Sequence, residues 1–493
     1  MIVAGKELLI PKEIEKIAEI LEKKGFEAYL VGGCVRDLLL GKKPKDWDFT
    51  TNAKPEQIIA SFEKTFYEND YGTVGVVNET SSDETLKVVE ITPYRLESAY
   101  SDKRRPDSVS FSDNIYEDLK RRDFTINAIA LSISKGQLID PHKGQEDIAL
   151  KIVRAVGDPV ERFSEDALRM LRAIRIATEL NFTVEDSTTT AVRQKSDLIT
   201  HISGERVRDE LMRIIGSDRP MDGLIMAQNM GILKFILPEL EGGIGVKQNK
   251  AHAYDVWEHS LRTLQHAAKK KFPSHVRIAA LFHDIGKPDT RRWSEEKKEW
   301  TFYGHDVVGA RITKKILQRL KFPKDTIEIV SRLVRWHMFF SDTETITLSA
   351  VRRMISNVGK EYIWDLMDVR ICDRIGTGRP KESPYRLRKY RAMVDEASRD
   401  PLTVGMLKIN GEVIIRVTKI NPGPKIGYIL HALLEEVLDD PNKNSAEYLE
   451  KKALELSLLS EKELQERGEQ GKTRRKNEEG KVIKEIRSRH WVD

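Results

Sequence analysis

Two aspartates separated by one residue could bind a metal ion near the start of the sequence. Asp46 and Asp48 occur in the string KDWDFTTNA, whose pattern is typical of a short strand. Alternate residues of a strand project from the same side, so the two carboxylates are predicted to converge. Carboxylate oxygens suit Mg²⁺, and a pair of such ions lowers the pKa of an attacking hydroxyl and steadies a pyrophosphate leaving group. The motif therefore predicts magnesium-dependent phosphoryl transfer.

A glycine turn precedes these aspartates and could hold the phosphates on which they act. In LVGGCVRDLLLG, Gly32 and Gly33 end a predicted strand and begin a helix that carries Arg36. Glycines let the backbone approach a triphosphate, the first amides of a helix favour anions, and an arginine adds a charged fork. Either motif alone also occurs as a plain turn or a solvated strand end. The two together favour a nucleotide-phosphate site.

Two groups of arginines that follow could bind the rest of a nucleotide. Arg121, Arg122 and Asp123 stand before a predicted strand in DLKRRDFTINAIA, where they could hold ribose hydroxyls and phosphate oxygens. Four charged residues then recur at every third position of one predicted helix in EDALRMLRAIR: Asp166, Arg169, Arg172 and Arg175. Such neighbours share part of a helix face and could offer donors and acceptors to the Watson–Crick edge of a base. The alternative is an ordinary charged helix surface.

Histidines and aspartates in the second half of the chain have the composition of another metal site: His259, His283, Asp284 and Asp373. Imidazole with carboxylate suits a transition metal such as Mn²⁺, Ni²⁺ or Fe²⁺. The polar His–Asp pair inside the apolar string IAALFHDIG is otherwise costly to bury. His305 and His337 could extend the site to two metals, or could be core or capping histidines.

The elements that must position these residues change in character along the chain. Ile14, Ile17 and Leu21 recur at helical spacing, and strand-like runs follow at 26–33, 47–50, 73–77, 86–92 and 126–131, with a helix at 55–61. From about residue 159 onward, apolar residues recur at helical spacing. The predicted fold class is α+β, with a small α/β head followed by all-helical segments.

The composition fits a multidomain protein that works in a reducing compartment. The 493 residues are 40% hydrophobic and 33% charged, and 83 basic against 78 acidic residues permit nucleic-acid binding without demanding it. Two cysteines allow no disulfide framework, and no apolar stretch is long enough for a membrane span, so we expect a cytoplasmic protein without membrane partners. The sequence predicts no oligomeric state. The charge-dense segment 462–489 is predicted to be a solvated or disordered tail, with RNA contact as the alternative.

The strings quoted above, together with RRPDSVSF, DPHKGQEDI and SGERVRDELMRII, run in the order found in a known family. The chain resembles the bacterial class II tRNA nucleotidyltransferases and their relatives, the bacterial poly(A) polymerases, most strongly over residues 25–240. The order H…HD…D over about residues 251–380 resembles the HD superfamily of metal-dependent phosphohydrolases. The resemblance implies Mg²⁺ at the transferase site and tRNA, ATP and CTP as partners.

Roles for individual residues are implied by the same resemblance. Asp46 and Asp48 would bind the catalytic Mg²⁺, while Gly33, Arg36 and Arg122 would contact the nucleotide. Asp166 and Arg169 would act as a protein template for ATP and CTP, with Arg172 and Arg175 assisting. His259, His283, Asp284 and Asp373 would hold the second metal.

The sequence patterns and the resemblance together predict six divisions of the chain and an order of preference among activities. The divisions are an N-terminal helix (1–25), a nucleotidyltransferase head (26–150), a helical neck and body with base recognition (151–245), an HD domain (251–380), a helical C-terminal portion (381–460) and a charged tail (461–493). The segment 94–110 resembles the flexible loop of full CCA-adding members, which favours CCA addition over a CC-only enzyme. A poly(A) polymerase or A-adding enzyme is the alternative within this chemistry. A hydrolase of RNA or nucleotides, acting through the HD domain, is the alternative of another class.

Overall fold

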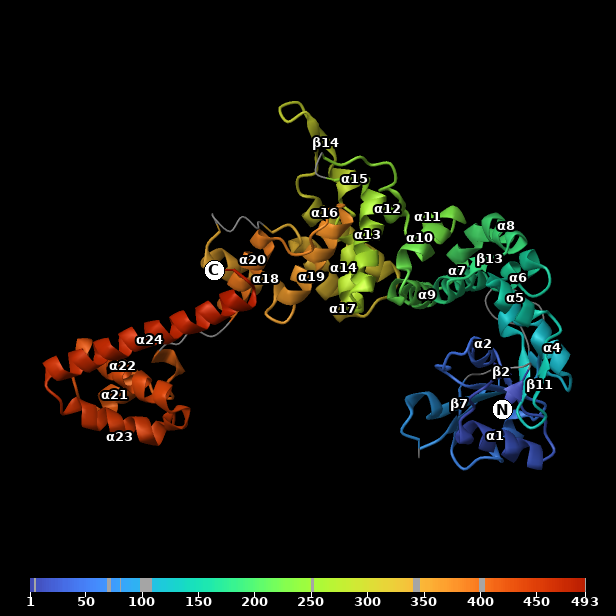
Figure 1. The fold of residues 1–493 in the computed structure, drawn as a ribbon, viewed down its shortest axis with the longest axis horizontal. Coiled ribbons are helices and arrows are strands. Elements are labelled where there is room, and N and C mark those ends of the chain that lie inside the picture. The colour runs from blue at the N-terminus through green and yellow to red at the C-terminus, as the bar shows by residue number, and fades with distance from the viewer. Residues whose placement is uncertain are drawn as a thin grey trace. The chain divides into compact units, whose positions relative to one another are not determined.

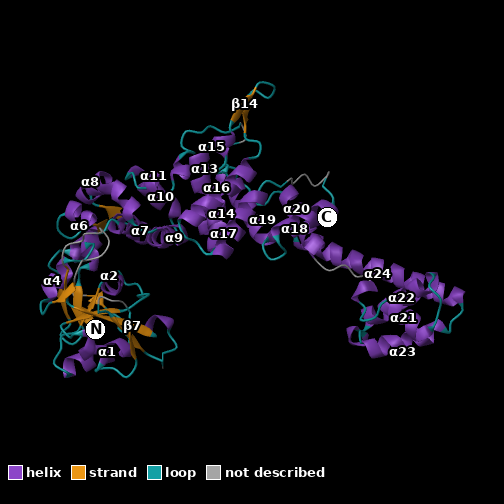
Figure 2. Cartoon of the chain, turned by 180° about the vertical axis from the view of Figure 1, so that it is seen from behind, coloured by secondary structure: helices purple, strands orange, loops and turns teal. Residues whose placement is uncertain are grey.

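The computed structural model describes residues 1–3, 6–68, 72–79, 81–97, 109–249, 252–339, 346–398 and 404–492. Its internal contacts divide the chain into two units, 1–337 with 368–380, and 338–367 with 381–493. Strands gather in the N-terminal part of the first unit, and the remainder of both units is mostly helical (Figure 1, Figure 2). The α+β class predicted from the sequence is confirmed. The six predicted division boundaries remain predictions.

A seven-stranded mixed sheet forms the N-terminal part, in the order β11-β10-β3-β4-β7-β6-β5. Its strands are β3 (Tyr29–Val31), β4 (Asp48–Thr51), β5 (Thr65–Tyr67), β6 (Val74–Val77), β7 (Val88–Pro93), β10 (Ala130–Ser132) and β11 (Gln137–Ile139). Only the central β4 and β7 pair in parallel. Leu30, Phe49 and Ile91 on three adjacent strands are fully buried, so the sheet's interior is the core of this part.

Short helices and hairpins surround this sheet: α1 (Lys12–Lys23), α2 (Gly33–Leu39), α3 (Pro55–Ile59), α4 (Ile115–Lys120), α5 (Gly144–Leu150), and the pairs β1 (Ile2–Val3) with β2 (Lys6–Glu7) and β8 (Arg95–Glu97) with β9 (Val109–Phe111). The strand predicted at 126–131 is partly wrong, because Thr125–Asn127 form a 3₁₀ helix and the strand begins at Ala130. Thr125 donates through Oγ1 to Asp147 and through its amide to the Arg154 carbonyl, which draws this turn toward α5 and away from the sheet.

The helices that follow are α6 (Pro159–Glu165), α7 (Leu168–Leu180), α8 (Asp186–Lys195), α9 (Gly204–Gly216), α10 (Pro220–Asn229), α11 (Leu233–Ile236) and α12 (Pro238–Glu241), with the parallel pair β12 (Ile152–Val153) and β13 (Thr183–Val184). One continuous helix through Asp166 and Arg175 was expected, and this is wrong. Asp166 is extended (φ −134°, ψ 104°), and its carboxylate accepts the Leu168 amide, so it separates α6 from α7.

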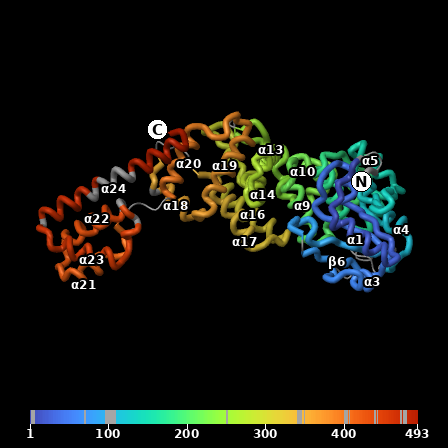
Figure 3. Tube along the Cα trace, turned by 60° about the horizontal axis from the view of Figure 1, so that its bottom comes forward, coloured from blue at the N-terminus to red at the C-terminus, as the bar shows by residue number. Residues whose placement is uncertain are grey.

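The last part of the first unit is a helical bundle with a projecting hairpin. It contains α13 (Val256–Lys269), α14 (Ser274–Phe282), α15 (Lys287–Thr290), β14 (Arg292–Ser294), β15 (Glu299–Thr301), α16 (His305–Arg319), α17 (Lys324–Trp336) and the C-terminal half of α19 (Ile363–Gly376). Helix α13 packs on α14 and α10, which lie beside it in Figure 3. Glycine permits the close approach of α19, because a Cβ on Gly376 would lie 2.0 Å from Thr263 Oγ1.

The second unit is all-helical in its described residues and contains α18 (Leu348–Val358), α20 (Tyr385–Ser398), α21 (Gly411–Thr418), α22 (Pro424–Asp439), α23 (Ala446–Ser457) and α24 (Glu461–Arg489). The segment 462–489 was predicted to be solvated or disordered: disorder is wrong, since α24 is one long helix, whereas most of its described side chains are exposed to solvent. Ser460 and Glu463 form a capping box at its start, and Leu464 and Ile486 are buried against neighbouring helices. Among the described helices, none has both the length and the apolar content that crossing a bilayer requires.

Candidate functional site

Three carboxylates meet at the glycine turn of the sheet. Asp48 begins β4 and stands directly beside Glu90 of β7, its register partner. Asp46 lies in the bend before the strand, which corrects the expectation that both aspartates are on it. A Cβ on Gly32 would lie 3.5 Å from Asp48 Oδ2, and a Cβ on Gly33 would lie 3.9 Å from Asp46 Oδ1. The structure therefore brings both predicted aspartates to the turn.

The acidity of these groups reflects their crowding. Burial, with the negative charges of Asp46 and Glu90, raises the pKa of Asp48 to about 7. Burial also raises the pKa of Glu90, and Glu68 and Asp46 raise it further. Asp48 is half-buried, and Asp46 and Glu90 are exposed. Three carboxylates crowded together at two central strands form a donor set of oxygen atoms that fits a hard divalent cation. The sequence analysis did not identify Glu90, although it is the one carboxylate in the predicted strand that contains VVEIT.

Two arginines lie at the same turn. Gly32 has φ +81°, a conformation that side chains rarely adopt, and a Cβ there would lie 3.3 Å from Arg122 Nη1. Arg122 donates to Asp118 Oδ2 (3.1 Å), which is fully buried, and a Cβ on Gly33 would lie 3.6 Å from Arg36 Nη2. The glycines thus keep open a space between carboxylates and guanidinium groups, as a triphosphate with its metal requires.

A partly exposed ion pair joins this site to α7. Asp123 accepts from Arg172 Nη2 (2.6 Å) and from Asn127 Nδ2 (3.2 Å). Asn127 in turn accepts from Arg36 Nη1 at 2.8 Å. Although burial raises the pKa of Asp123, Arg172 and Asn127 hold it at about 2. Of the predicted arginine cluster 121–123, Arg122 reaches the glycine turn, Arg121 pairs with Asp118, and Asp123 orients Arg172.

The four charged residues predicted to share a helix face have different partners. Asp166 accepts from Arg206 Nη2 of α9 at 2.9 Å, and Arg169 donates to Glu165 Oε2 at 2.6 Å. Arg175 is 5% exposed and pairs with Glu179 (2.9 Å) and Glu210 (2.5 Å). Arg175 therefore lies in the packing between α7 and α9, apart from the other three. Arg206 and Glu165, which sequence reasoning missed, hold the positions of Asp166 and Arg169.

A second centre gathers the predicted histidines and aspartates of the bundle. His259 Nε2 lies 3.0 Å from His283 Nε2, 3.1 Å from Asp284 Oδ2 and 3.4 Å from Asp373 Oδ1. On the other carboxylate oxygen, Asp284 Oδ1 lies 3.3 Å from His305 Nε2 and 3.7 Å from His337 Nε2. All six residues are buried, with at most 8% of their surface exposed. Asp284 thus stands between two groups of ligand atoms, and the structure brings His305 and His337 to the same place.

Backbone carbonyls orient three of these rings. His283, His305 and His337 each direct Nδ1 at a carbonyl three residues earlier, at 2.7–2.8 Å. A ring that donates through Nδ1 presents an unprotonated Nε2, which is the form that ligates a metal. Both members of the pair His305 and His337 are oriented in this way, so their Nε2 atoms, which face one another at 3.3 Å, have no proton between them when both rings are neutral. A cation between them fits this arrangement.

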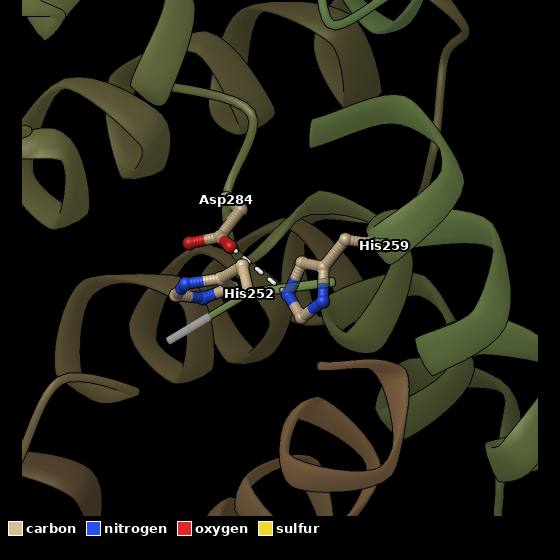
Figure 4. Close-up of side chains that lie close together, drawn as sticks. All are labelled: His252, His259 and Asp284. Carbon is tan, nitrogen blue, oxygen red and sulfur yellow. Dashed lines mark ion pairs between the residues drawn. The ribbon is translucent and has the colours of Figure 1, made fainter. Parts of the chain in front are cut away.

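Two further residues of this centre escaped the sequence analysis. His252 lies with His259 and Asp284 in a third group of ligand atoms within 4.8 Å of one another, which Figure 4 shows. Its only signal was its position seven residues before His259. Lys287 is 6% exposed and donates to Asp284 Oδ2 at 2.6 Å. Although burial raises the pKa of Asp284, His283 and Lys287 hold it well below its usual range.

Known proteins match both halves of this arrangement. Three family models match: "Poly A polymerase head domain" over residues 28–154, "Probable RNA and SrmB- binding site of polymerase A" over 181–243, and "HD domain" over 256–377. The chain is 32% identical over 422 residues to the A-adding tRNA nucleotidyltransferase of Deinococcus radiodurans, covering 83% of this chain and 91% of that protein. It is 31% identical over 445 residues to the CCA-adding enzyme of Geobacillus thermodenitrificans, covering 90% and 96%.

A solved structure matches over nearly the same span. The crystal structure of the Bacillus stearothermophilus CCA-adding enzyme in complex with CTP aligns with a TM-score of 0.60 at 27% identity. The alignment covers 91% of this chain and 98% of that one. The match therefore extends across the head, the helical middle and the histidine-containing bundle.

Proposed function

This chain belongs to the family of tRNA nucleotidyltransferases and poly(A) polymerases, and from that premise we propose that it adds C, C and A to the 3′ end of tRNA, using CTP and ATP. Enzymes of this family depend on divalent metal ions. The observation that carries the proposal is the convergence of Asp46, Asp48 and Glu90 on the Gly32–Gly33 turn beside Arg122. We also place the protein in the cytoplasm, in keeping with the buried Cys34 and Cys372, which form no disulfide.

The chain's own residues hold the reactants at this turn. Asp46, Asp48 and Glu90 would hold Mg²⁺, which would supply a lowered pKa for the attacking 3′-hydroxyl and charge stabilisation for the leaving pyrophosphate. Arg36 and Arg122 contact the triphosphate as charged forks. The space left by Gly32 and Gly33 lets the phosphates approach the backbone. Positioning and charge stabilisation account for the transfer, since phosphoryl transfer needs little covalent help from the protein.

Base choice is assigned to Asp166 and Arg169, with Arg172 assisting. Cytosine and adenine both present an exocyclic amine beside an unprotonated ring nitrogen, whereas uracil and guanine present a carbonyl beside an N–H. A carboxylate accepts from the amine and a guanidinium donates to the ring nitrogen, so one pair of side chains suits both accepted bases. A wrong base leaves these groups unpaired and is rejected. Arg175 is left out of this assignment, because its side chain is buried and pairs with Glu210 of α9.

Three tRNA transcripts test the proposal against A-only addition. They end before the CCA, after the first C, and after both C residues, and each is given CTP or ATP alone. We expect CTP to extend the first two and ATP to extend the third by one residue. An A-adding enzyme would extend only the third, and a poly(A) polymerase would extend any of them with a run of A. The loop expected to distinguish CCA from CC addition lies largely outside the described residues (98–108), so the experiment decides this point.

A second candidate function, hydrolysis of phosphodiesters, is favoured by the two groups of ligand atoms around Asp284. His259, His283 and Asp373 form one group, and His305 and His337 form the other. Transition metals such as Mn²⁺, Ni²⁺ or Fe²⁺ held there would supply a nucleophilic hydroxide at neutral pH. Lys287, beside Asp284, can contact a phosphate oxygen. Release of nitrophenol from bis(p-nitrophenyl) phosphate with each metal tests this function; no release with any of them would leave this centre as a scaffold.

A further inference from the structure

An antiparallel hairpin projects from the bundle between two of its metal-centre segments. Strands β14 and β15 pair Trp293 with Trp300 and Ser294 with Glu299, and residues 295–298 form the turn. The hairpin follows the segment with His283 and Asp284 and leads directly into His305 at the start of α16. Figure 1 and Figure 2 show β14 standing away from the helices around it.

The hairpin exposes aromatic rings that are in contact with its own arginine and lysine side chains. Trp293 is 48% exposed, and its ring meets that of Trp300 edge-on at 5.3 Å between centroids. The Arg291 guanidinium lies 3.7 Å above the centre of the Trp300 ring. Tyr303 is 74% exposed, and Lys297 Nζ donates to its Oη at 2.8 Å. Large exposed rings held in fixed positions mark an interaction surface.

The base of the hairpin touches the metal centre. Phe302 offers its carbonyl to His305 Nδ1 at 2.7 Å, and its ring lies 5.6 Å from Lys287 Nζ. Lys287 donates to Asp284 in turn. Tyr303, the most exposed ring, is therefore next in sequence to a residue that borders the centre. A chain bound along the hairpin would end beside Phe302, the residue that contacts His305 and Lys287.

The chemistry of this surface suits a single nucleic-acid strand. Flat rings stack on bases of any sequence, and the nearby arginine and lysine groups pair with phosphates. The acidic residues Glu295, Glu296 and Glu299 interrupt the positive charge, so no broad basic track is present for a duplex backbone. We propose that the hairpin 291–303 binds the 3′ end of single-stranded RNA and guides it into the His–Asp centre. The proposal rests on the hydrolytic function proposed for that centre.

Kinetics with two substrates test the proposal in the full-length protein with Mn²⁺. Trp293→Ala and Tyr303→Ala are compared with wild type on an unstructured oligoribonucleotide and on bis(p-nitrophenyl) phosphate, which is too small to reach the hairpin. Each variant should raise KM for the RNA by about tenfold, from the loss of one stacked base, and leave KM for the small substrate unchanged. Trp293→Phe keeps a flat ring and should retain most of the RNA affinity. Tyr116→Ala, which removes a ring that is 55% exposed elsewhere, should change neither KM.

Photo-crosslinking of the same RNA with an internal 4-thiouridine close to its 3′ end separates this proposal from the hydrolytic one. Crosslinks to peptides within 291–303 are expected, and Trp293→Ala should reduce them. Hydrolysis of both substrates with equal RNA KM in all variants, or crosslinks that avoid the hairpin, would overturn the proposal. If neither substrate is hydrolysed, the hydrolytic function fails, and guidance into a reactive centre fails with it; crosslinks at the hairpin would then preserve RNA binding alone.

Discussion

Asp48 occupies a position where its charge is disfavoured unless a cation is nearby. Burial and the neighbouring Asp46 and Glu90 raise its pKa to about 7. A bound cation would favour the ionised carboxylate, so metal binding is expected to release a proton from Asp48. Asp48→Asn should lower CTP incorporation by at least about 10³-fold, because several kcal/mol of metal-assisted stabilisation are lost. Removing a crowded charge should leave the melting temperature unchanged or higher.

If Glu90 is a third metal ligand, Glu90→Gln should also lower CTP incorporation and leave the melting temperature unchanged or higher. Glu79→Gln, which removes an exposed charge paired with Lys64, is the control and should behave as wild type. Full incorporation by Glu90→Gln would contradict the three-carboxylate site. The melting temperature of the same samples, measured by calorimetry, distinguishes loss of a metal ligand from misfolding of the N-terminal part.

Asp166 is expected to set base choice, and Arg206 to hold Asp166 in place. Asp166→Ala should raise the use of UTP and GTP relative to CTP and ATP by roughly 10- to 100-fold, since one pair of base-reading hydrogen bonds is worth about 1–3 kcal/mol. Arg206→Ala should move selectivity in the same direction by less, because the Leu168 amide still holds the carboxylate. Competition between the four nucleotides on one tRNA measures both. Unchanged selectivity in Asp166→Ala would remove Asp166 from the template.

Residue types and spacing predicted some ligands and missed others for a physical reason. Asp46, Asp48 and the His–Asp pair lie close in sequence, so local spacing reports their proximity. Glu90 meets Asp48 only through the parallel pairing of β4 with β7, a contact between segments about forty positions apart that no local pattern reveals. His252 precedes its helix in a loop, where periodicity carries no information.

At the scale of elements, the break between α6 and α7 separates residues that a regular three-residue spacing had grouped. The extended backbone of Asp166 turns its carboxylate toward α9, and the helix that restarts at Leu168 turns Arg175 into the interface with Glu210. Residue spacing predicted the helices but not this break. An Asp that caps the start of a helix cannot be distinguished by spacing from an Asp inside a charged helix. The same limit applies to α24, whose few apolar residues suffice to bury it against its neighbours.

Arg175 is therefore predicted to stabilise the fold and not to select nucleotides. Arg175→Ala leaves Glu210 buried without its partner and should cost about 3 kcal/mol of unfolding free energy. Arg213→Ala is the matched control, because Arg213 also pairs with Glu179 but is half exposed, and should cost less than about 1 kcal/mol. Differential scanning calorimetry gives the stabilities, and nucleotide competition should show wild-type selectivity in both. Altered selectivity in Arg175→Ala alone would return Arg175 to the template.

At the scale of the whole molecule, two candidate metal centres of different chemistry are carried by separate elements. The carboxylates of β4 and β7 form an oxygen site, and α13, α16 and the turn after α14 form a site of imidazole and carboxylate. The fold class and the family could be predicted from short sequence motifs in a fixed order, because each motif lies within one local element of the fold.

The two centres should be separable by substitution. His283→Ala should abolish phosphodiesterase activity and lower the bound transition metal, measured by inductively coupled plasma mass spectrometry, while CTP incorporation persists. Asp46→Asn should abolish CTP incorporation and leave the phosphodiesterase activity and the bound transition metal unchanged. His275→Ala, in the adjacent helix α14 and outside both groups of ligands, is the control for either effect. Loss of both activities in His283→Ala with an unchanged melting temperature would mean that the centres act as one.

The central claim, ordered addition of C, C and A, is tested most directly by sequencing new 3′ ends. A tRNA that lacks its CCA is incubated with the full-length protein, Mg²⁺ and an equal mixture of CTP and ATP, and the products are sequenced at single-nucleotide resolution. We predict that nearly all extended molecules end in CCA and grow no further, and that Asp46→Asn yields no extension. Products ending in a single A or in a run of A, with no C incorporated, would contradict the claim.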